Sequence, residues 1–275
     1  MRGIIHVTAA LFAVAAVLAA CDDDEPAGDP AAKRTLVAAT SADYAPVAYV
    51  DGDGEIAGLD PEIARAVGAK LGFETKVVNT GFDGILAGLD ARKYDIVVSG
   101  INDTEQREKR FDFVTYFTAG TAFYAAAGRA GEIDGLGDLC GRRVGVARGT
   151  IQQTYAAEQD RACEDGGRPG VAIQIFPDQN AVTLALGSAR VEVAMADSPV
   201  AAHVARQSAG RIAVAGDIFA SAPYGIAVPK GSGLAERLRD ALNELIADGT
   251  YRRILAEHGL EAGALERSEI NAATG

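Results

Sequence analysis

From Thr35 onward, short apolar runs alternate with longer segments in which apolar residues recur every three or four positions. The first pattern is typical of buried strands and the second of amphipathic helices. The predicted strands cover residues 36–39, 75–78, 94–98, 144–146, 173–176 and 191–196. Strands that alternate with helices predict an α/β fold with a mainly parallel sheet. Because the alternation starts again near residue 136, we expect two lobes of similar construction.

Two helices are predicted with particular clarity. One begins at Asp60-Pro61-Glu62, where an aspartate cap and a proline favour a helix start, and its face of Leu59, Ile63, Ala66, Val67 and Leu71 is expected in the core. The other lies near the C-terminus, and we expect its apolar face to pack on a lobe. That face is formed by Leu234, Leu238, Leu242 and Leu245, followed by Tyr251, Ile254 and Leu255.

Residues 51–54, Asp-Gly-Asp-Gly, predict a hairpin turn between residues 49–50 and 56–57. The acids of this turn also have the spacing of a calcium loop. Ile56, however, occupies the position at which such a loop requires glycine, so we expect no metal here.

The N-terminus has the organisation of a secretory signal. Arg2 precedes an apolar run over residues 9–20, which is too short to span a bilayer, and Cys21 follows at once. Residues 18–21, Leu-Ala-Ala-Cys, resemble the bacterial lipobox, so residues 1–20 are predicted to be a signal peptide and Cys21 to be lipidated. The alternative is a signal peptide with a chance cysteine. The acidic, Pro- and Gly-rich residues that follow predict a tether over 21–34.

Charge and length narrow the function classes. The net charge is −12, and it becomes −13 if residues 1–20 are removed, because they contain one basic residue and no acid. Such an excess of acid argues against nucleic acid as a partner. The remaining length of about 240 residues is sufficient for two small lobes.

Beyond Cys21 the chain has only Cys140 and Cys163. An even pair in an exported protein is more simply a disulfide than a metal site, and two unpaired buried cysteines are the alternative. Sequence motifs of hydrolases, zinc enzymes and nucleotide-binding loops are missing, so we expect neither catalysis nor a cofactor.

Short segments throughout the chain after the tether resemble the polar amino-acid family of bacterial solute-binding proteins, family 3, which has the type 2 periplasmic-binding-protein fold. The matching segments are residues 40–46, 58–60, 81–85, 93–100, 104–109, 112–113, 144–150, 196–199, 224–228 and 248–251. The resemblance implies two α/β lobes joined by two hinge crossings. Lobe 1 would contain residues 35–123 and 222–275, and lobe 2 residues 124–221. The crossings are expected near residues 123–127 and 216–224.

The resemblance also implies a site for a free amino acid. Arg107 matches the arginine that grips the α-carboxylate, a task that suits a planar fork of donors. Asp197 matches the acid that binds the α-ammonium. The alternatives are a surface arginine in the charged run 105–110 and an aspartate that only caps the helix after it. A zwitterion held by both would bridge the lobes and favour closure.

The other implied ligand contacts are weaker individually. Thr150 begins a helix and would add its hydroxyl to the carboxylate site. Tyr44 and Phe82 match the aromatic walls, although core packing is the alternative for Phe82. Ser99, Gly100 and Asn102 would contribute backbone and side-chain partners.

The side-chain specificity remains open from the sequence. Relatives that bind cationic ligands often have an acid at the position of Ser41, whereas Asp43 stands nearby in this chain. Asn102 replaces a common Thr or Ser, and Arg148 beside the cleft would favour an acidic or amide side chain.

We therefore predict an extracytoplasmic protein, anchored by lipid to the outer face of the cell membrane, that binds an amino acid. It would deliver this ligand as a monomer to the membrane permease of an ABC importer. The alternatives are an exported dehydratase-like enzyme of the same fold and a ligand sensor for a membrane receptor.

Overall fold

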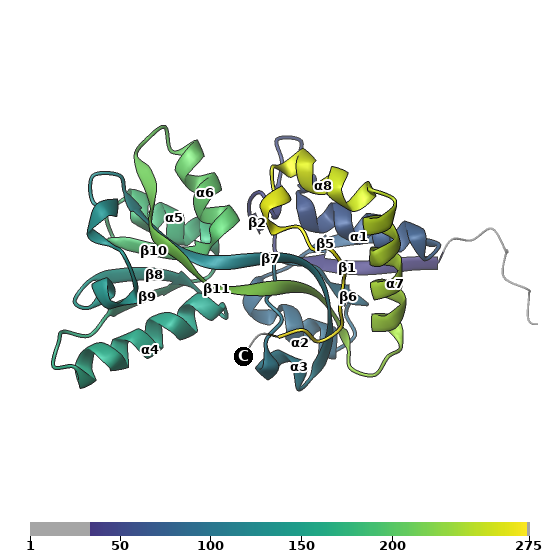
Figure 1. The fold of residues 1–275 in the computed structure, drawn as a ribbon, viewed down its shortest axis with the longest axis horizontal. Helices are drawn as coiled ribbons and strands as arrows, with labels where there is room; N and C mark the ends of the chain where they lie inside the picture. Colours follow the sequence, from purple (N-terminus) through teal and green to yellow (C-terminus); the bar gives the residue numbers. More distant parts are fainter. Residues whose placement is uncertain (1–33, 274–275) are drawn as a thin grey trace, which may run out of the picture. The chain divides into compact units, whose positions relative to one another are not determined.

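The computed structural model describes residues 34–273, which form a mixed α/β structure with an eight-stranded sheet (Figure 1). The strand order is β5-β1-β6-β11-β7-β10-β8-β9. In chain order these strands are β1 (Arg34–Thr40), β5 (Phe73–Asn79), β6 (Ile96–Val97), β7 (Phe111–Ala126), β8 (Arg143–Ala147), β9 (Ala172–Phe176), β10 (Val193–Asp197) and β11 (Ile212–Pro229). The predicted α/β class is confirmed.

The two ends of the sheet are parallel and its centre is antiparallel. Strand β1 pairs in parallel with β5 and β6, and β8 pairs in parallel with β9 and β10. The long strands β7 and β11 lie between these sets and pair with each other in antiparallel fashion. A separate antiparallel sheet contains β2 (Asp43–Tyr44), β3 (Ala48–Val50) and β4 (Ile56–Ala57), which confirms the predicted hairpin.

Helices flank both sets of parallel strands (Figure 1). Those beside β1, β5 and β6 are α1 (Leu59–Lys70), α2 (Ile85–Asp90), α7 (Leu234–Ala247) and α8 (Thr250–His258). Those beside β8, β9 and β10 are α4 (Ile151–Asp165), α5 (Gln179–Gly187) and α6 (Ser198–Gln207). The short α3 (Glu105–Glu108) precedes β7, and 3₁₀ turns cover Phe82–Gly84, Ala130–Glu132, Leu136–Leu139 and Glu261–Gly263.

The predicted apolar faces are in the core. Leu59, Ile63 and Val67 of α1 are fully buried, and so are Leu238 and Leu242 of α7. Burying such side chains contributes about 1.5–3 kcal/mol each. Packing of these faces therefore accounts for much of the helix stability.

The predicted cap at Asp60 is wrong. Helix α1 begins at Leu59 after Gly58, and no side chain caps it. Asp60 is completely buried instead, and the Tyr116 hydroxyl donates to its Oδ1 at 2.5 Å. Burial raises the pKa of Asp60 to about 7. Sequence spacing could not show this, because Tyr116 comes from β7, 56 positions away.

Strands β7 and β11 connect the two sets of parallel strands. Strand β10 pairs with residues 121–125 of β7, at the end of β7 that is nearer the second set of parallel strands, whereas β11 pairs with β7 from Phe111 to Ala126. The β11 register shifts between Ala215 and Ala222, within the second predicted crossing at residues 216–224. Bulges locally bend a strand and increase its twist. The lobe boundaries themselves stay a prediction.

The predicted disulfide is confirmed between Cys140 and Cys163, whose Cα atoms lie 5.7 Å apart. Cys163 is fully buried on α4. The bond closes a loop of 23 positions. It therefore ties α4 to the 3₁₀ turn that precedes β8.

Replacing both cysteines by alanine is expected to lower the free energy of unfolding by about 3 kcal/mol, because the open chain gains loop entropy when it unfolds. For a chain of this size the melting temperature should fall by about 6–12 °C. Calorimetric melts of the wild type and the double variant would measure this. A reductant should lower the wild-type melting temperature and leave that of the variant unchanged; equal melts for all four samples would contradict the prediction.

Candidate functional site

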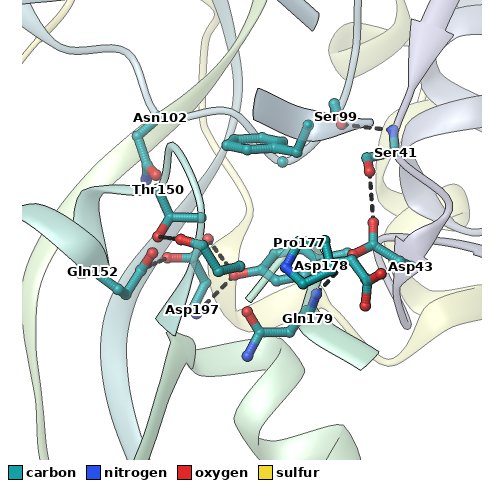
Figure 2. A pocket seen from close by; sticks show the side chains of 14 residues that line it. Ser41, Asp43, Ser99, Asn102, Thr150, Gln152, Pro177, Asp178, Gln179 and Asp197 are labelled. Carbon is teal, nitrogen blue, oxygen red and sulfur yellow. Dashed lines mark hydrogen bonds between the residues drawn. The ribbon is translucent and has the colours of Figure 1, made fainter. Parts of the chain in front are cut away.

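A cavity lined mainly by residues with polar side chains lies where segments from the two sets of strands meet (Figure 2). One side is formed by residues that follow β1 and β6, and the other by residues at the carboxyl ends of β8, β9 and β10. The lining residues are Ser41, Asp43, Tyr44, Phe82, Ser99, Gly100, Asn102, Ala147, Thr150, Gln152, Pro177, Asp178, Gln179 and Asp197. Ligands of open α/β sheets bind beyond the carboxyl ends of strands, which is where these residues lie.

Asp197 ends β10 and is the most extensively hydrogen-bonded acid of the cavity. Tyr44 and Tyr224 donate their hydroxyls to its Oδ2 at 3.0 and 2.6 Å, and Gln152 Nε2 donates to its Oδ1 at 2.8 Å. Only 2% of Asp197 is exposed. No lysine or arginine of residues 34–273 forms a salt bridge with it. The site therefore holds a buried carboxylate that can still accept a cation.

Burial raises the pKa of Asp197 to about 6, although its hydrogen-bond donors and the charge of Arg107 oppose this shift. A cationic group bound at Asp197 would need the ionised carboxylate. We therefore expect affinity for such a ligand to be constant from pH 8 to 7 and to fall up to tenfold per pH unit below about 6. Calorimetric titrations at each pH would measure this. A dissociation constant that stays unchanged down to pH 4.5 would contradict it.

A second acid, Asp43, joins the two sides of the cavity. The Ser41 hydroxyl donates to Asp43 Oδ1 at 2.6 Å, and the backbone N–H of Gln179 donates to Oδ2 at 2.8 Å. Gln179 is the first residue of α5, so Asp43 accepts from a helix N-terminus 136 positions away. Figure 2 shows Asp43 and Asp197 at opposite ends of the labelled residues, with Pro177 and Asp178 between them.

The predicted contacts Ser99, Gly100 and Asn102 all line the cavity. Ser99 Oγ accepts from the Ser41 N–H at 2.9 Å, and the Gly100 N–H donates to the Tyr116 hydroxyl at 3.2 Å. Asn102 is 4% exposed, and its Nδ2 has no hydrogen-bond partner. An unpaired buried donor is costly. This amide can therefore donate to a ligand in the cavity.

Thr150 and the two aromatic residues that the sequence suggests as ligand contacts also line the cavity. Thr150 caps α4: its hydroxyl donates to the Ala147 carbonyl at 2.8 Å and accepts from the Gln153 N–H at 3.3 Å. Tyr44 directs its hydroxyl to Asp197, and Phe82 is half-buried. Arg148, which follows the lining residue Ala147, is exposed and pairs with Asp83 at 3.9 Å.

Arg107 is the one predicted contact outside the set of lining residues. Its Nη1 donates to the Asn102 carbonyl at 2.8 Å and its Nη2 to the Gly149 carbonyl at 3.2 Å. Burial lowers its pKa to about 10, so the guanidinium keeps its charge at pH 7. Arg107 therefore holds together the two segments that carry Asn102 and Thr150, and three of its five N–H donors have no partner among the described hydrogen bonds.

Comparison with known proteins identifies the family. A profile of the bacterial extracellular solute-binding proteins, family 3, matches residues 36–261. The chain belongs to this family.

Relatives of known name are similar over most of the chain. The arginine-binding protein ArgT of Corynebacterium glutamicum is 31% identical, over 97% of this chain and 95% of that protein. The solved structure of an ancestral arginine-binding protein bound to arginine superposes with a TM-score of 0.76 at 33% identity, covering 82% of this chain and 98% of that one. These relatives are named as binding proteins, not as enzymes.

One neighbour is connected with catalysis. An ancestral amino-acid-binding protein, described as a precursor of cyclohexadienyl dehydratase, superposes with a TM-score of 0.74 at 31% identity. The match covers 82% of this chain and 95% of that one.

The location of the family is part of its description, because family 3 proteins are described as extracellular. Among residues 34–273, no helix has the length and apolar character needed to cross a membrane. The predicted signal peptide and Cys21 lie outside the described residues.

Sequence reasoning missed several lining residues of this family 3 cleft, namely Ala147, Gln152, Pro177, Asp178 and Gln179. Gln152 and Gln179 are buried amides, and Gln152 binds Asp197 directly. A signal for Pro177–Gln179 was present, because these residues directly follow β9. Gln152 had no such signal, since its position on α4 resembles that of any helical glutamine.

Proposed function

We propose that this family 3 protein binds a free amino acid in the cavity and delivers it to an ABC-type importer. The observation that carries the proposal is Asp197, a 2%-exposed carboxylate that lines the cavity without a salt-bridge partner. A buried carboxylate of this kind suits an α-ammonium, because an ammonium is compact and donates three hydrogen bonds.

The opposite end of the ligand would be an α-carboxylate. Asn102 Nδ2 supplies an unpaired donor for it, and Gly149-Thr150 brings the N-terminus of α4 close to the same place. Arg107 bridges these two segments, so a small movement of its guanidinium would add a charged donor to the carboxylate. Tyr44 and Phe82 would cover the aliphatic part of the ligand.

Binding would couple to closure of two lobes, residues 35–123 with 222–275 and residues 124–221. Contacts between the cavity walls support this part of the proposal: Tyr44 reaches Asp197, Asp43 reaches Gln179, and Arg107 reaches Gly149. A ligand that touches both walls favours the closed state, because only differential contact shifts such an equilibrium.

The remaining proposals concern location and partners. Residues 1–20 would be removed as a signal peptide, Cys21 would carry lipid on the outer face of the membrane, and residues 21–34 would be the tether. The protein would act as a monomer with a membrane permease. We propose a binding protein rather than an enzyme, since Asp197 and the unpaired Asn102 amide suit the two ends of an amino acid and the named relatives are binding proteins.

A thermal-shift screen of the purified full-length protein against the common amino acids tests the proposal. A ligand at 100 times its dissociation constant should stabilise the protein by about 2.7 kcal/mol, which corresponds to a shift of about 5–10 °C. A polyamine and several organic acids serve as controls. If only an organic acid shifts the melt, the amino-acid assignment is wrong and turnover of cyclohexadienyl acids should be assayed next.

A further inference from the structure

The charge of the cavity is one-sided. Asp43, Asp178 and Asp197 all contribute to its lining, whereas none of the lining residues is a lysine or arginine. Like charges that face one cavity repel each other, which raises the free-energy cost of burying the charged groups. A ligand of opposite charge offsets that cost. One α-ammonium would compensate only one of the three carboxylates. The other two lie away from Asp197 along the set of residues in Figure 2.

Asp43 is fixed by two hydrogen bonds and still has free acceptor sites on its carboxylate oxygens. Each of its oxygens accepts one hydrogen bond, from Ser41 Oγ and from the Gln179 N–H. A carboxylate oxygen has two lone pairs, so each can accept a second donor. Asp43 is partly buried, and no cation within residues 34–273 forms a salt bridge with it.

Asp178 adds a second carboxylate beside Asp43. Its Oδ1 caps α5 by accepting from the Ala181 N–H at 2.7 Å, and its Oδ2 has no partner among the described hydrogen bonds. The positive end of α5 offsets part of this charge. Because both acids still face the cavity without a cation, this end favours a positively charged group.

A separate observation, the unpaired amide of Asn102, also favours a polar ligand in this cavity. The Nδ2 of Asn102 is buried, has no partner and belongs to the lining. A buried donor of this kind needs an acceptor such as a carboxylate. None of the three aspartates accepts a hydrogen bond from it. The ligand must therefore present an acceptor to Asn102 and positive charge to the acids.

We infer that the ligand is an amino acid with a cationic side chain, and that Asp43 selects it. This inference rests on the proposed function. The α-ammonium binds Asp197, and the guanidinium or ammonium of the side chain binds Asp43, with Asp178 increasing the negative potential. Ser41 sets the orientation of Asp43 through its hydrogen bond.

The experiment measures affinities of the full-length protein for arginine, lysine, citrulline and glutamine by calorimetry. Citrulline has nearly the shape of arginine without its charge, and glutamine is a shorter neutral control. We expect arginine or lysine to bind at least 100-fold more tightly than citrulline. The arginine-to-lysine ratio separates a guanidinium site from an ammonium site.

The variant Asp43→Asn distinguishes two roles of Asp43: binding the cationic side chain of the ligand, or holding β2 against α5 through its hydrogen bond to Gln179. A cation partner predicts that arginine and lysine bind about 10- to 100-fold more weakly while citrulline changes less than threefold. A support predicts equal losses for all ligands, which would overturn the inference. The matched control is Asp53→Asn, which removes the same charge from an exposed turn outside the cavity.

The wild-type comparison keeps the test decisive if Asp43→Asn fails to fold. Equal affinity for citrulline and arginine would overturn the cationic assignment and leave amino-acid binding in place. Binding of no amino acid at all would overturn the proposed function, and this inference with it.

Discussion

Replacing Asp197 by asparagine is expected to weaken amino-acid binding by about 100- to 3,000-fold. The substitution keeps the volume of the side chain and removes the charge that would face the α-ammonium. Loss of one partner from a buried ion pair costs about 3–5 kcal/mol, and each 1.4 kcal/mol is tenfold in affinity. Calorimetric titration with the ligand found in the screen measures the change.

The fold should tolerate this change. Burial raises the pKa of Asp197 to about 6, so the folded protein binds a proton more readily than the unfolded chain does. Stability from this group is therefore present at low pH and is lost as the pH rises from about 4 through 6. At pH 7 the ligand-free variant should melt at the wild-type temperature or above it. Asp165→Asn, an exposed change on α4, is the matched control, and near wild-type affinity of Asp197→Asn would refute the assigned role.

Replacing Arg107 by alanine is expected to weaken binding by about 100-fold or more. The variant loses the charged fork proposed for the α-carboxylate, and it also loses the bonds that join the Asn102 and Gly149 carbonyls. Arg107→Lys keeps the charge without the fork, so it should recover only part of the affinity. Titrations of both variants measure these losses.

Arg110→Ala is the control for this pair, because Arg110 is an exposed neighbour whose side chain pairs with Asp90 and lies over the Phe111 ring, away from the cavity lining. It should leave the dissociation constant unchanged. If Arg107→Ala binds within a few-fold of wild type, Arg107 is a bridge between the two segments and not a ligand contact.

The prediction from sequence succeeded best for the helices and strands of the second half of the chain. The helix predicted at Thr150 begins at Ile151, directly after the Thr150 cap, because a capping side chain is a local signal. The predicted strands 144–146 and 173–176 correspond to β8 and β9. The same reasoning failed at Asp60, where a cap-like residue is instead buried against Tyr116. Tertiary burial outweighed a local preference there.

The candidate site was predicted in part. Seven of the eight expected ligand contacts line the cavity, because family resemblance and the ends of strands both point to them. Arg107 bonds to carbonyls beside the cavity, and Gln152 and Gln179 were missed. Their roles depend on partners from other strands and helices, which no local pattern reveals.

The sequence by itself determined the family, the α/β class and the order of the elements, since motifs in order along the chain and apolar periodicity are properties of short segments. It favoured a disulfide between Cys140 and Cys163, and the structure decided that the two cysteines are paired. Only the tertiary structure decided how Asp197 and Asp43 are used. Asp197 meets Tyr44 across 153 positions and Asp43 meets Gln179 across 136, and both acids share a cavity without lysine or arginine. The charge balance of that cavity depends on which distant groups fold around it, and folding alone brings them together.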